Sequence, residues 1–333
     1  MKLFVSIPKN SDVFRTFIAE NVQKYLEERF EVHYSSSEKH LSVEEFKTEV
    51  KDAEAVITGW GHFCFTPEIL SGTKIKYIVH TGGSVGSLVT PEIYDMGINV
   101  ISGNMLYAES VAEGTLAYMM TGLRRIPHYV DQVRNGGWME GWDTEGLFDR
   151  TVGIVSLGAI SRILIDMLQM FRVKIKIYSG HQIDEDYLKS INAEQVSLEE
   201  IFSTCDIVSV HSAMNEKTRH MIKKEHFDML RDGALFINTA RGHVIEEQEM
   251  IEALKENRFK AVLDVYWEEP LAKDSPLRSL KNVFPLPHQG GPTLDRRPFI
   301  TMRIADAIFE VEQNGSSKLE ISKSAAARMT VGG

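Results

Sequence analysis

The stretch TVGIVSLGAISRILIDML, residues 151–168, decides the fold of this chain. An apolar run, a short turn and apolar residues at helical spacing predict a strand, a tight turn and a helix. The dinucleotide-binding fingerprint places glycine at three points of such a turn, and the chain has Ser156, Gly158 and Ser161 there. A side chain at Gly158 would block the phosphates, whereas serine is small enough for the other two points. We therefore expect a dinucleotide to be bound by Ser156, Gly158, Ala159 and Ile160.

The next strand-like run, residues 174–178, does not select one form of the cofactor. A carboxylate at its end would bind the ribose 2′-hydroxyl of NAD, and an arginine would bind the 2′-phosphate of NADP. The chain has neither and continues with Ser179, Gly180 and His181. Ser179 suits either ribose and His181 suits a phosphate, but both also suit a plain polar turn. We expect NAD(H) or NADP(H), with Ser179 and His181 as candidate contacts and the preference undetermined.

Strand-like and helix-like runs alternate along nearly the whole chain, which indicates an α/β protein. The strand-like runs are residues 2–7, 30–34, 55–58, 76–80, 151–156, 174–178, 207–210, 234–237, 261–265 and 283–286. They form two series, so we expect two Rossmann-like or flavodoxin-like parallel-sheet domains. Residues 1–100 and 292–333 form the substrate domain, and residues 101–291 form a nucleotide-binding domain inserted in it. The helix-like segment 107–134 is expected to kink at Pro127.

The composition argues against several classes of protein. The 333 residues carry a formal net charge of −10, whereas binding nucleic acid needs a basic patch. No apolar run reaches the length of a membrane span, and MKLFVSIPKN lacks the apolar core of a signal peptide. Cys64 and Cys205 lie far apart, and no histidine and cysteine spacing fits zinc. We expect a cytoplasmic protein with no metal, no nucleic-acid partner and no membrane association.

Three polar side chains follow strand-like runs of the second series. NTARGHVIEE (238–247) carries Arg241, AVLDVYWEEPL (261–271) carries Glu269, and PLPHQGGPT (285–293) carries His288. An arginine fork grips a carboxylate, a histidine donates a proton near neutral pH, and a carboxylate favours the charged imidazolium. Each residue alone is compatible with a surface ion pair or a structural role. Together, past strand ends where α/β folds place chemistry, they predict reduction of a 2-oxo acid.

With NMLYAESVAEGTLA (104–117) and VGIVSLGAISR (152–162), these segments make the chain similar to the D-isomer-specific 2-hydroxyacid dehydrogenase family. The resemblance covers nearly the whole chain. It implies that Arg241, Glu269 and His288 are catalytic and that Asp264 lies near the nicotinamide carboxamide. It also implies a homodimer built on the helix that starts near Tyr107. The other residues that it places in the cofactor site are Thr239, Ala240 and Gly290.

The chain departs from the family in two loops. HTGGSVGSLV, residues 80–89, has Gly86 where the family usually has aspartate, yet the N–H groups of Gly83, Ser84 and Val85 can still bind a substrate carboxylate. The family's His-x-Pro is His-Ser-Ala here, which leaves His211 as a candidate cofactor contact or as a capped strand end. Trp60 either packs in the core or borders the substrate. In the second case it favours a 2-oxo acid larger than glyoxylate.

The sequence therefore predicts an NAD(P)-dependent oxidoreductase that transfers a hydride between the cofactor and C2 of a 2-oxo or 2-hydroxy acid. Arg241 and the amides near Gly83 hold the carboxylate, His288 protonates the carbonyl oxygen, and Glu269, rather than Glu268, supports His288. A formate or phosphite dehydrogenase of the same fold is one alternative, although glutamate at position 269 disfavours formate chemistry. A nucleotide-sensing binding protein, like some corepressors, is the other, because the fingerprint is damaged.

Overall fold

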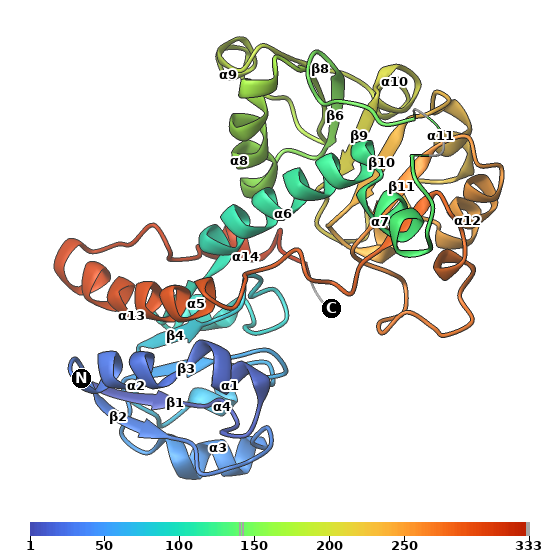
Figure 1. Cartoon of the computed structure of the whole chain (residues 1–333). Helices are drawn as coiled ribbons and strands as arrows, with labels where there is room; N and C mark the ends of the chain where they lie inside the picture. The colour runs from blue at the N-terminus through green and yellow to red at the C-terminus, as the bar shows by residue number, and fades with distance from the viewer. Residues whose placement is uncertain (140, 142, 331–333) are drawn as a thin grey trace. The chain divides into compact units, whose positions relative to one another are not determined.

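The computed structural model describes residues 1–139, 141 and 143–330. The chain divides into two compact units (Figure 1). Unit 1 comprises Met1–Tyr107 and Pro292–Gly333, and unit 2 comprises Ala108–Gly291. The chain passes from unit 1 to unit 2 later than the expected residue 100. The reason is that a fifth strand, β5 (Asn99–Ser102), still pairs within unit 1. Unit 2 is thus inserted in unit 1.

Unit 1 is a five-stranded parallel sheet in the order β2-β1-β3-β4-β5. Leu3 and Val5 face one apolar cluster while Phe4 faces the other, so the sheet is buried on both sides. The other strands are β1 (Lys2–Val5), β2 (Glu31–Tyr34), β3 (Ala55–Thr58) and β4 (Tyr77–His80). The helices are α1 (Asp12–Phe17), α2 (Glu20–Glu27) and α13 (Arg296–Asn314) on one side, and α3 (Val43–Val50), α4 (Pro67–Leu70), α5 (Glu92–Asp95) and α14 (Lys323–Ala326) on the other.

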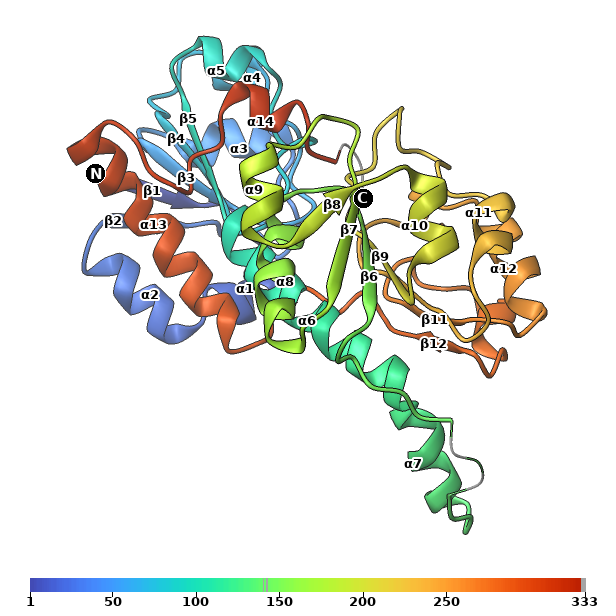
Figure 2. The same cartoon turned by 90° about the horizontal axis from the view of Figure 1, so that it is seen from above.

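Unit 2 is a seven-stranded parallel sheet in the order β12-β11-β10-β9-β6-β7-β8. Helices α6 and α8 lie on one face of this sheet, and α10, α11 and α12 lie on the other (Figure 2). Leu235 and Ile237 pack in the first apolar layer and Phe236 packs in the second. The strands are β6 (Thr151–Val155), β7 (Lys174–Tyr178), β8 (Ala193–Gln195), β9 (Ile207–Val210), β10 (Leu235–Asn238), β11 (Lys260–Leu263) and β12 (Val283–Pro285). The helices are α6 (Asn104–Arg124), α7 (Ile126–Arg134), α8 (Ala159–Leu168), α9 (Glu185–Ser190), α10 (Leu198–Thr204), α11 (Lys224–Met229) and α12 (Glu247–Lys255), with short 3₁₀ turns η1 (Gln169–Phe171), η2 (Gly242–Val244) and η3 (Pro276–Arg278).

Each sheet has a point where the strand order reverses, and open α/β sheets bind ligands outside the carboxyl ends of the strands at such a point. In unit 2 it lies between β6 and β9, which are followed by Ser156 and His211. In unit 1 it lies between β1 and β3, and Trp60 follows β3. The topology therefore puts the fingerprint turn at the expected ligand-binding edge of unit 2.

The expected helix over residues 107–134 is two helices. The chain breaks at Arg125, whose φ of 49° is left-handed, and α7 starts at Ile126. Pro127 sits in the first turn of α7, where a missing N–H costs no hydrogen bond, so it starts a helix and does not kink one. Among the described residues, no helix is both long and apolar enough to cross a membrane.

Candidate active site

The carboxylate of Glu269 holds the ring of His288. Its Oε2 lies 2.6 Å from Nδ1 of His288, and its Oε1 accepts the backbone N–H of Tyr266 at 3.1 Å. The bond at Nδ1 leaves Nε2 of the ring as the nitrogen that can exchange a proton with a substrate. Glu269, rather than its neighbour Glu268, is therefore the residue that orients this histidine.

The buried carboxylate of Asp264 fixes the loop that carries His288. Its Oδ1 accepts the N–H of Gln289 at 2.8 Å, and its Oδ2 accepts the N–H of Gly290 at 2.7 Å. Burial raises the pKa of Asp264, and the two N–H bonds oppose that shift. A Cβ on Gly290 would lie 2.8 Å from Oδ2, so only glycine fits. This loop holds His288 at a φ of 51°, and Asp264 acts as its positioning residue.

Arg241 follows β10 in a turn built by the side chain of Asn238. The amide of Asn238 accepts the N–H of Ala240 at 3.0 Å and donates to the carbonyl of Arg241 at 3.1 Å. A Cβ on the next residue, Gly242, would lie 2.0 Å from the carbonyl of Tyr266, so this position also requires glycine.

The described residues leave one buried nitrogen of the Arg241 guanidinium without a hydrogen-bond partner. One terminal nitrogen donates to the carbonyl of Ala240 at 2.7 Å, but Nε is buried and has no partner among the described residues. Burial lowers the pKa of Arg241, and the charge of Glu269 opposes that shift. A buried N–H without an acceptor is costly, so this nitrogen points to an anionic ligand.

The fingerprint turn leaves room for a phosphate but carries strain. Ser156 adopts a φ of 80°, a conformation that costs a residue with a side chain about 1 kcal/mol or more and that glycine adopts freely. Its hydroxyl pairs with that of Ser212 at 2.6 Å. Ser161 is buried, and its hydroxyl accepts the N–H of Gly158 at 2.7 Å. Apart from its chain neighbours, no described residue comes within 4 Å of a Cβ built on Gly158, and Ala159–Ile160 begin α8 with N–H groups that lack helical partners.

The remaining predicted contacts of unit 2 are largely packed inside the protein. Ring Nε2 of His211 pairs with the hydroxyl of Ser209 at 2.9 Å, and burial lowers the pKa of His211 to about 4, so its ring is neutral. Thr239 pairs with the hydroxyl of Thr115 at 3.1 Å. Thr239 and Ala240 are each 8% exposed. These side chains shape the ends of β9 and β10.

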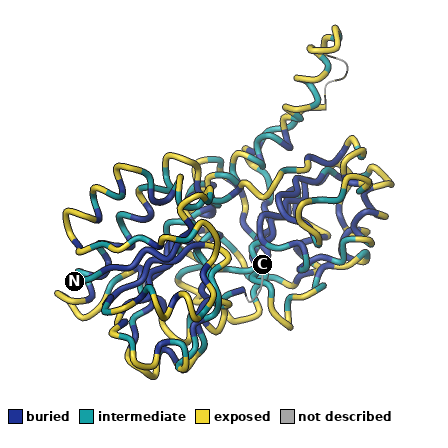
Figure 3. The backbone as a smooth tube through the Cα atoms, turned by 90° about the horizontal axis from the view of Figure 1, so that it is seen from below, coloured by how far each residue is buried: buried dark blue, intermediate teal, exposed yellow. Residues whose placement is uncertain are grey.

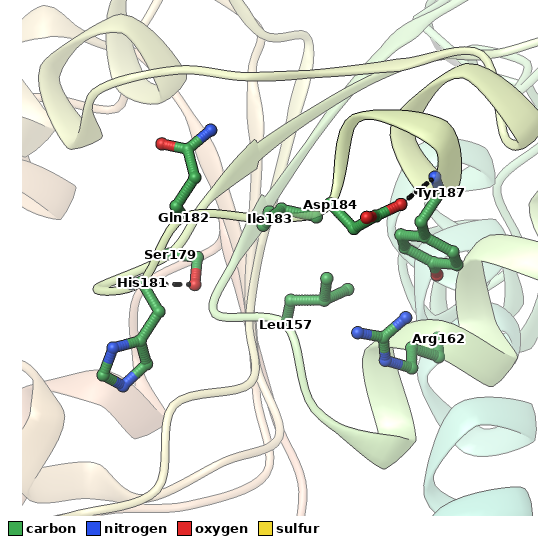
Figure 4. A pocket seen from close by; sticks show the side chains of 8 residues that line it. All are labelled: Leu157, Arg162, Ser179, His181, Gln182, Ile183, Asp184 and Tyr187. Atoms are coloured by element: carbon green, nitrogen blue, oxygen red, sulfur yellow. Dashed lines mark hydrogen bonds between the residues drawn. The ribbon is translucent and has the colours of Figure 1, made fainter.

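A pocket of about 340 Å³ lies beyond the end of β7 (Figure 4). Its lining residues are Leu157, Arg162, Ser179, His181, Gln182, Ile183, Asp184 and Tyr187. Ser179 and His181 thus line the same pocket. Two charged residues that were not predicted from the sequence, Arg162 and Asp184, also line it. The strand end lacks an arginine, but Arg162 reaches the pocket from the first turn of α8. Arg162 directly follows Ser161, the third position of the fingerprint, and this position in the sequence could have predicted its place near the cofactor.

In unit 1, the three predicted amides differ in their surroundings. The N–H of Val85 lies 3.5 Å from Sδ of Met329, and the Val85 side chain is fully buried, so a substrate carboxylate would have to replace this sulfur contact. Within the described part of the chain, no hydrogen bond uses the N–H of Gly83 or Ser84. Trp60 is 44% exposed, so it is not a core residue.

Trp60 lies among aromatic and basic side chains of unit 1. Its ring makes edge contacts with Phe17 and Tyr107, and the guanidinium of Arg297 lies 5.8 Å from its centre. The hydroxyl of Tyr107 is buried without a partner among the described residues. Among those residues, no group of three or more His, Cys, Asp or Glu side chains is placed to hold a metal.

The model of the D-isomer specific 2-hydroxyacid dehydrogenase family, NAD binding domain, matches residues 116–290. The match covers more than half of the chain and falls within unit 2. The chain belongs to this family. The resemblance seen in the sequence is therefore confirmed, and so is an NAD-binding domain of this family, with the choice between NAD and NADP left open.

Individual relatives agree with the family. A D-3-phosphoglycerate dehydrogenase of Methanocaldococcus jannaschii is 30% identical over 314 residues, which cover 93% of this chain but 57% of that protein. This chain thus spans little more than half of that relative. A glyoxylate reductase/hydroxypyruvate reductase of Homo sapiens is 31% identical over 245 residues, 72% of this chain and 74% of that protein.

The solved structure of D-2-hydroxyisocaproate dehydrogenase matches with a TM-score of 0.79 and 20% identity, over 96% of this chain and 99% of that one. At this identity the match shows the fold alone. The fold class of two parallel-sheet domains is confirmed.

Proposed function

We propose that this chain is an NAD(P)-dependent D-2-hydroxyacid dehydrogenase that transfers a hydride between its cofactor and C2 of a 2-oxo or 2-hydroxy carboxylic acid. The observation that carries this proposal is the 2.6 Å pairing of His288 with Glu269. A histidine oriented at Nδ1 by a carboxylate is a general acid and base suited to a carbonyl oxygen. Steady-state reduction of a panel of 2-oxo acids, followed by cofactor absorbance, tests it.

The roles follow from the contacts of each residue. A nicotinamide cofactor held at the fingerprint turn would supply the hydride. Arg241 offers its Nε, which has no partner among the described residues, to the substrate carboxylate, and the amides of Gly83 and Ser84 are also of a kind that binds carboxylates. His288 gives a proton to the carbonyl oxygen in reduction and takes it back in oxidation, and Glu269 stabilises the charged ring.

The fingerprint turn fits a dinucleotide, although it offers one donor fewer than a glycine-rich turn. Gly158 leaves the space open, but its N–H is already bonded to Ser161. The first N–H groups of α8 remain to bind phosphate oxygens. Because the N–H of Gly158 is not available to a phosphate, the turn departs from that of a typical dehydrogenase. This departure is the observation that favours a nucleotide-sensing protein as the second candidate. Tight dinucleotide binding without turnover of any 2-oxo acid would support that candidate.

We infer that the substrate is a 2-oxo acid larger than glyoxylate. Trp60 presents a large, half-exposed aromatic surface beside Tyr107 and Arg297 in unit 1. Such a surface gains little from a two-carbon acid, because the binding free energy of an apolar group scales with the area that it buries. A higher kcat/KM for glyoxylate than for every longer acid in the panel would contradict this inference.

The charge of Glu269 is expected to support the proton donor in reduction. Glutamine keeps the shape of this side chain and can still pair with Nδ1 of His288, but it carries no charge. In Glu269→Gln, kcat/KM for reduction is therefore expected to fall about tenfold or more, because a hydrogen bond to a charged group is worth about 1.5–3 kcal/mol. The measurement is steady-state kinetics, with Glu268→Gln as the matched control that keeps the wild-type kcat/KM. Equal kcat/KM in the wild type and Glu269→Gln would remove Glu269 from this role.

We propose that a second copy of the chain covers α7, which makes the protein a homodimer. Ile126, Val130 and Val133 lie on one face of α7 and are 48%, 40% and 56% exposed, and α7 buries none of its residues (Figure 3). An apolar stripe at this helical spacing normally faces a partner.

The dimer predicts a species near twice 37.7 kDa in sedimentation at micromolar concentration. The double variant Val130→Glu, Val133→Glu is expected to be monomeric, because it places two charges in the apolar face of α7. Asp131→Lys, on the polar side of α7, is expected to leave the dimer intact. A monomeric wild type would refute the dimer.

A further inference from the structure

We propose that the pocket beyond β7 binds the 2′-phosphate of NADPH, so that this chain prefers NADPH to NADH. This inference rests on the proposed function, because it presumes that the dinucleotide lies on the turn at Ser156–Ile160. The end of β7 is where a Rossmann fold reads the adenosine ribose. Three groups in the pocket suit a phosphate: the guanidinium of Arg162, the hydroxyl of Ser179 and the imidazole of His181 (Figure 4).

Arg162 is the cation of this pocket and is held in place. Its guanidinium stacks over the ring of Tyr187 at 4.3 Å, which limits its rotamers before any ligand binds. Among the described residues, no hydrogen bond or ion pair uses the guanidinium of Arg162, so that part of the chain leaves its donors available to a ligand. A planar guanidinium with free donors is the side chain best suited to grip a phosphate.

The loop that carries Ser179 and His181 is fixed by one side chain of β8. The amide of Gln195 donates to the carbonyls of His181 and Ser179 at 2.9 and 3.4 Å, and its oxygen accepts the N–H of Ile183 at 2.9 Å. The hydroxyl oxygen of Ser179 accepts the N–H of His181 at 3.3 Å, which leaves its own proton for a ligand oxygen. Donors that are already in place lose little entropy on binding.

Asp184 is the one acidic residue among the residues that line the pocket, and its side chain caps the N-terminus of α9. Its Oδ1 accepts the N–H of Tyr187 at 2.9 Å as the N-cap of α9. Figure 4 shows its carboxylate directed at the backbone of Tyr187 and away from Ser179 and His181. A carboxylate engaged in capping is not placed as the ribose-binding carboxylate of an NAD site, which leaves Arg162 as the charge that discriminates.

The test is a binding titration, which needs no turnover. Quenching of the protein's tryptophan fluorescence at fixed ionic strength gives the dissociation constants of NADPH and NADH. We expect NADPH to bind at least about tenfold more tightly in the wild type. In Arg162→Leu the affinity for NADPH is expected to fall about tenfold, while that for NADH changes less than about twofold. Lys189→Gln removes a cation from the exposed side of α9 and is expected to change neither affinity.

Competition on the wild type gives a second measurement that needs no variant. Adenosine 2′,5′-bisphosphate is expected to displace bound NADH at a lower concentration than 5′-AMP. Equal or tighter binding of NADH, or displacement at equal concentrations, would overturn the preference while leaving the proposed function intact. If NADH bound more tightly and Asp184→Asn removed that advantage, Asp184 would be the residue that binds the ribose. A protein that bound neither dinucleotide would contradict the proposed function itself.

Discussion

Replacing His288 with alanine is expected to lower kcat for reduction of the best 2-oxo acid by about 10²–10⁴, the usual effect of removing a general acid. The substitution removes the proton donor but leaves Asp264 and the N–H groups of Gln289 and Gly290 bonded to each other. The loop should therefore keep its shape, and the affinity for the dinucleotide should change little.

Steady-state kinetics give the loss in kcat, and a fluorescence titration shows whether the dinucleotide still binds. His33→Ala is the matched control, because this histidine lies half-exposed on an edge strand of unit 1. It is expected to retain wild-type kcat. Full activity in His288→Ala would defeat the proposed mechanism, and a large loss in His33→Ala would show that histidine substitutions act through stability.

Replacing Arg241 with glutamine is expected to lower kcat/KM by about 10²-fold or more. A hydrogen bond to a charged group is worth about 1.5–3 kcal/mol, and the guanidinium can make two of them to a carboxylate. Glutamine offers only one donor group and no charge. The buried, unpartnered Nε of Arg241 is the structural reason to expect that these bonds go to the substrate.

Arg241→Lys separates charge from geometry. Lysine keeps the cation but loses the planar fork, so its kcat/KM is expected between those of the wild type and Arg241→Gln. Thermal unfolding of both variants shows whether the turn after β10 survives. Wild-type kcat/KM in Arg241→Gln would mean that another residue holds the carboxylate.

Much of the fold could be predicted because the strands of both parallel sheets are buried on two faces and therefore read as apolar runs. Residues 207–210 are all apolar except Ser209, and β9 has these bounds. Two strands were missed. β8 spans only Ala193–Gln195 at the sheet edge, where the pairing depends on β7 and not on its own composition. β5 was hidden because its run begins with Asn99 and ends with Ser102.

The break between α6 and α7 could not be predicted, because it depends on the backbone at Arg125. Arginine is a good helix former, so its left-handed φ has no signal in the sequence. Pro127 marked the right region, but it fits the first turn of the new helix as well as a kink.

The part of the candidate site that could be predicted consists of residues that lie just after the ends of strands. Arg241, Glu269 and His288 each follow a strand, and the pairing of His288 with Glu269 needed only their common edge of the sheet. Contacts between distant segments were not predictable. The occupied N–H of Val85 depends on Met329, and the approach of Arg162 to the pocket depends on the stacking on Tyr187.

In the proposed reaction, a hydride reaches C2 of a 2-oxo acid at this site. The most direct test is reduction of the best acid from the panel with nicotinamide cofactor carrying deuterium at both C4 positions, followed by mass spectrometry and chiral separation of the product. We predict a D-2-hydroxy acid with one deuterium at C2, formed at least about a hundredfold more slowly by His288→Ala than by the wild type. A product without deuterium at C2, or no reduction of any 2-oxo acid by a protein that binds the cofactor, would contradict the account.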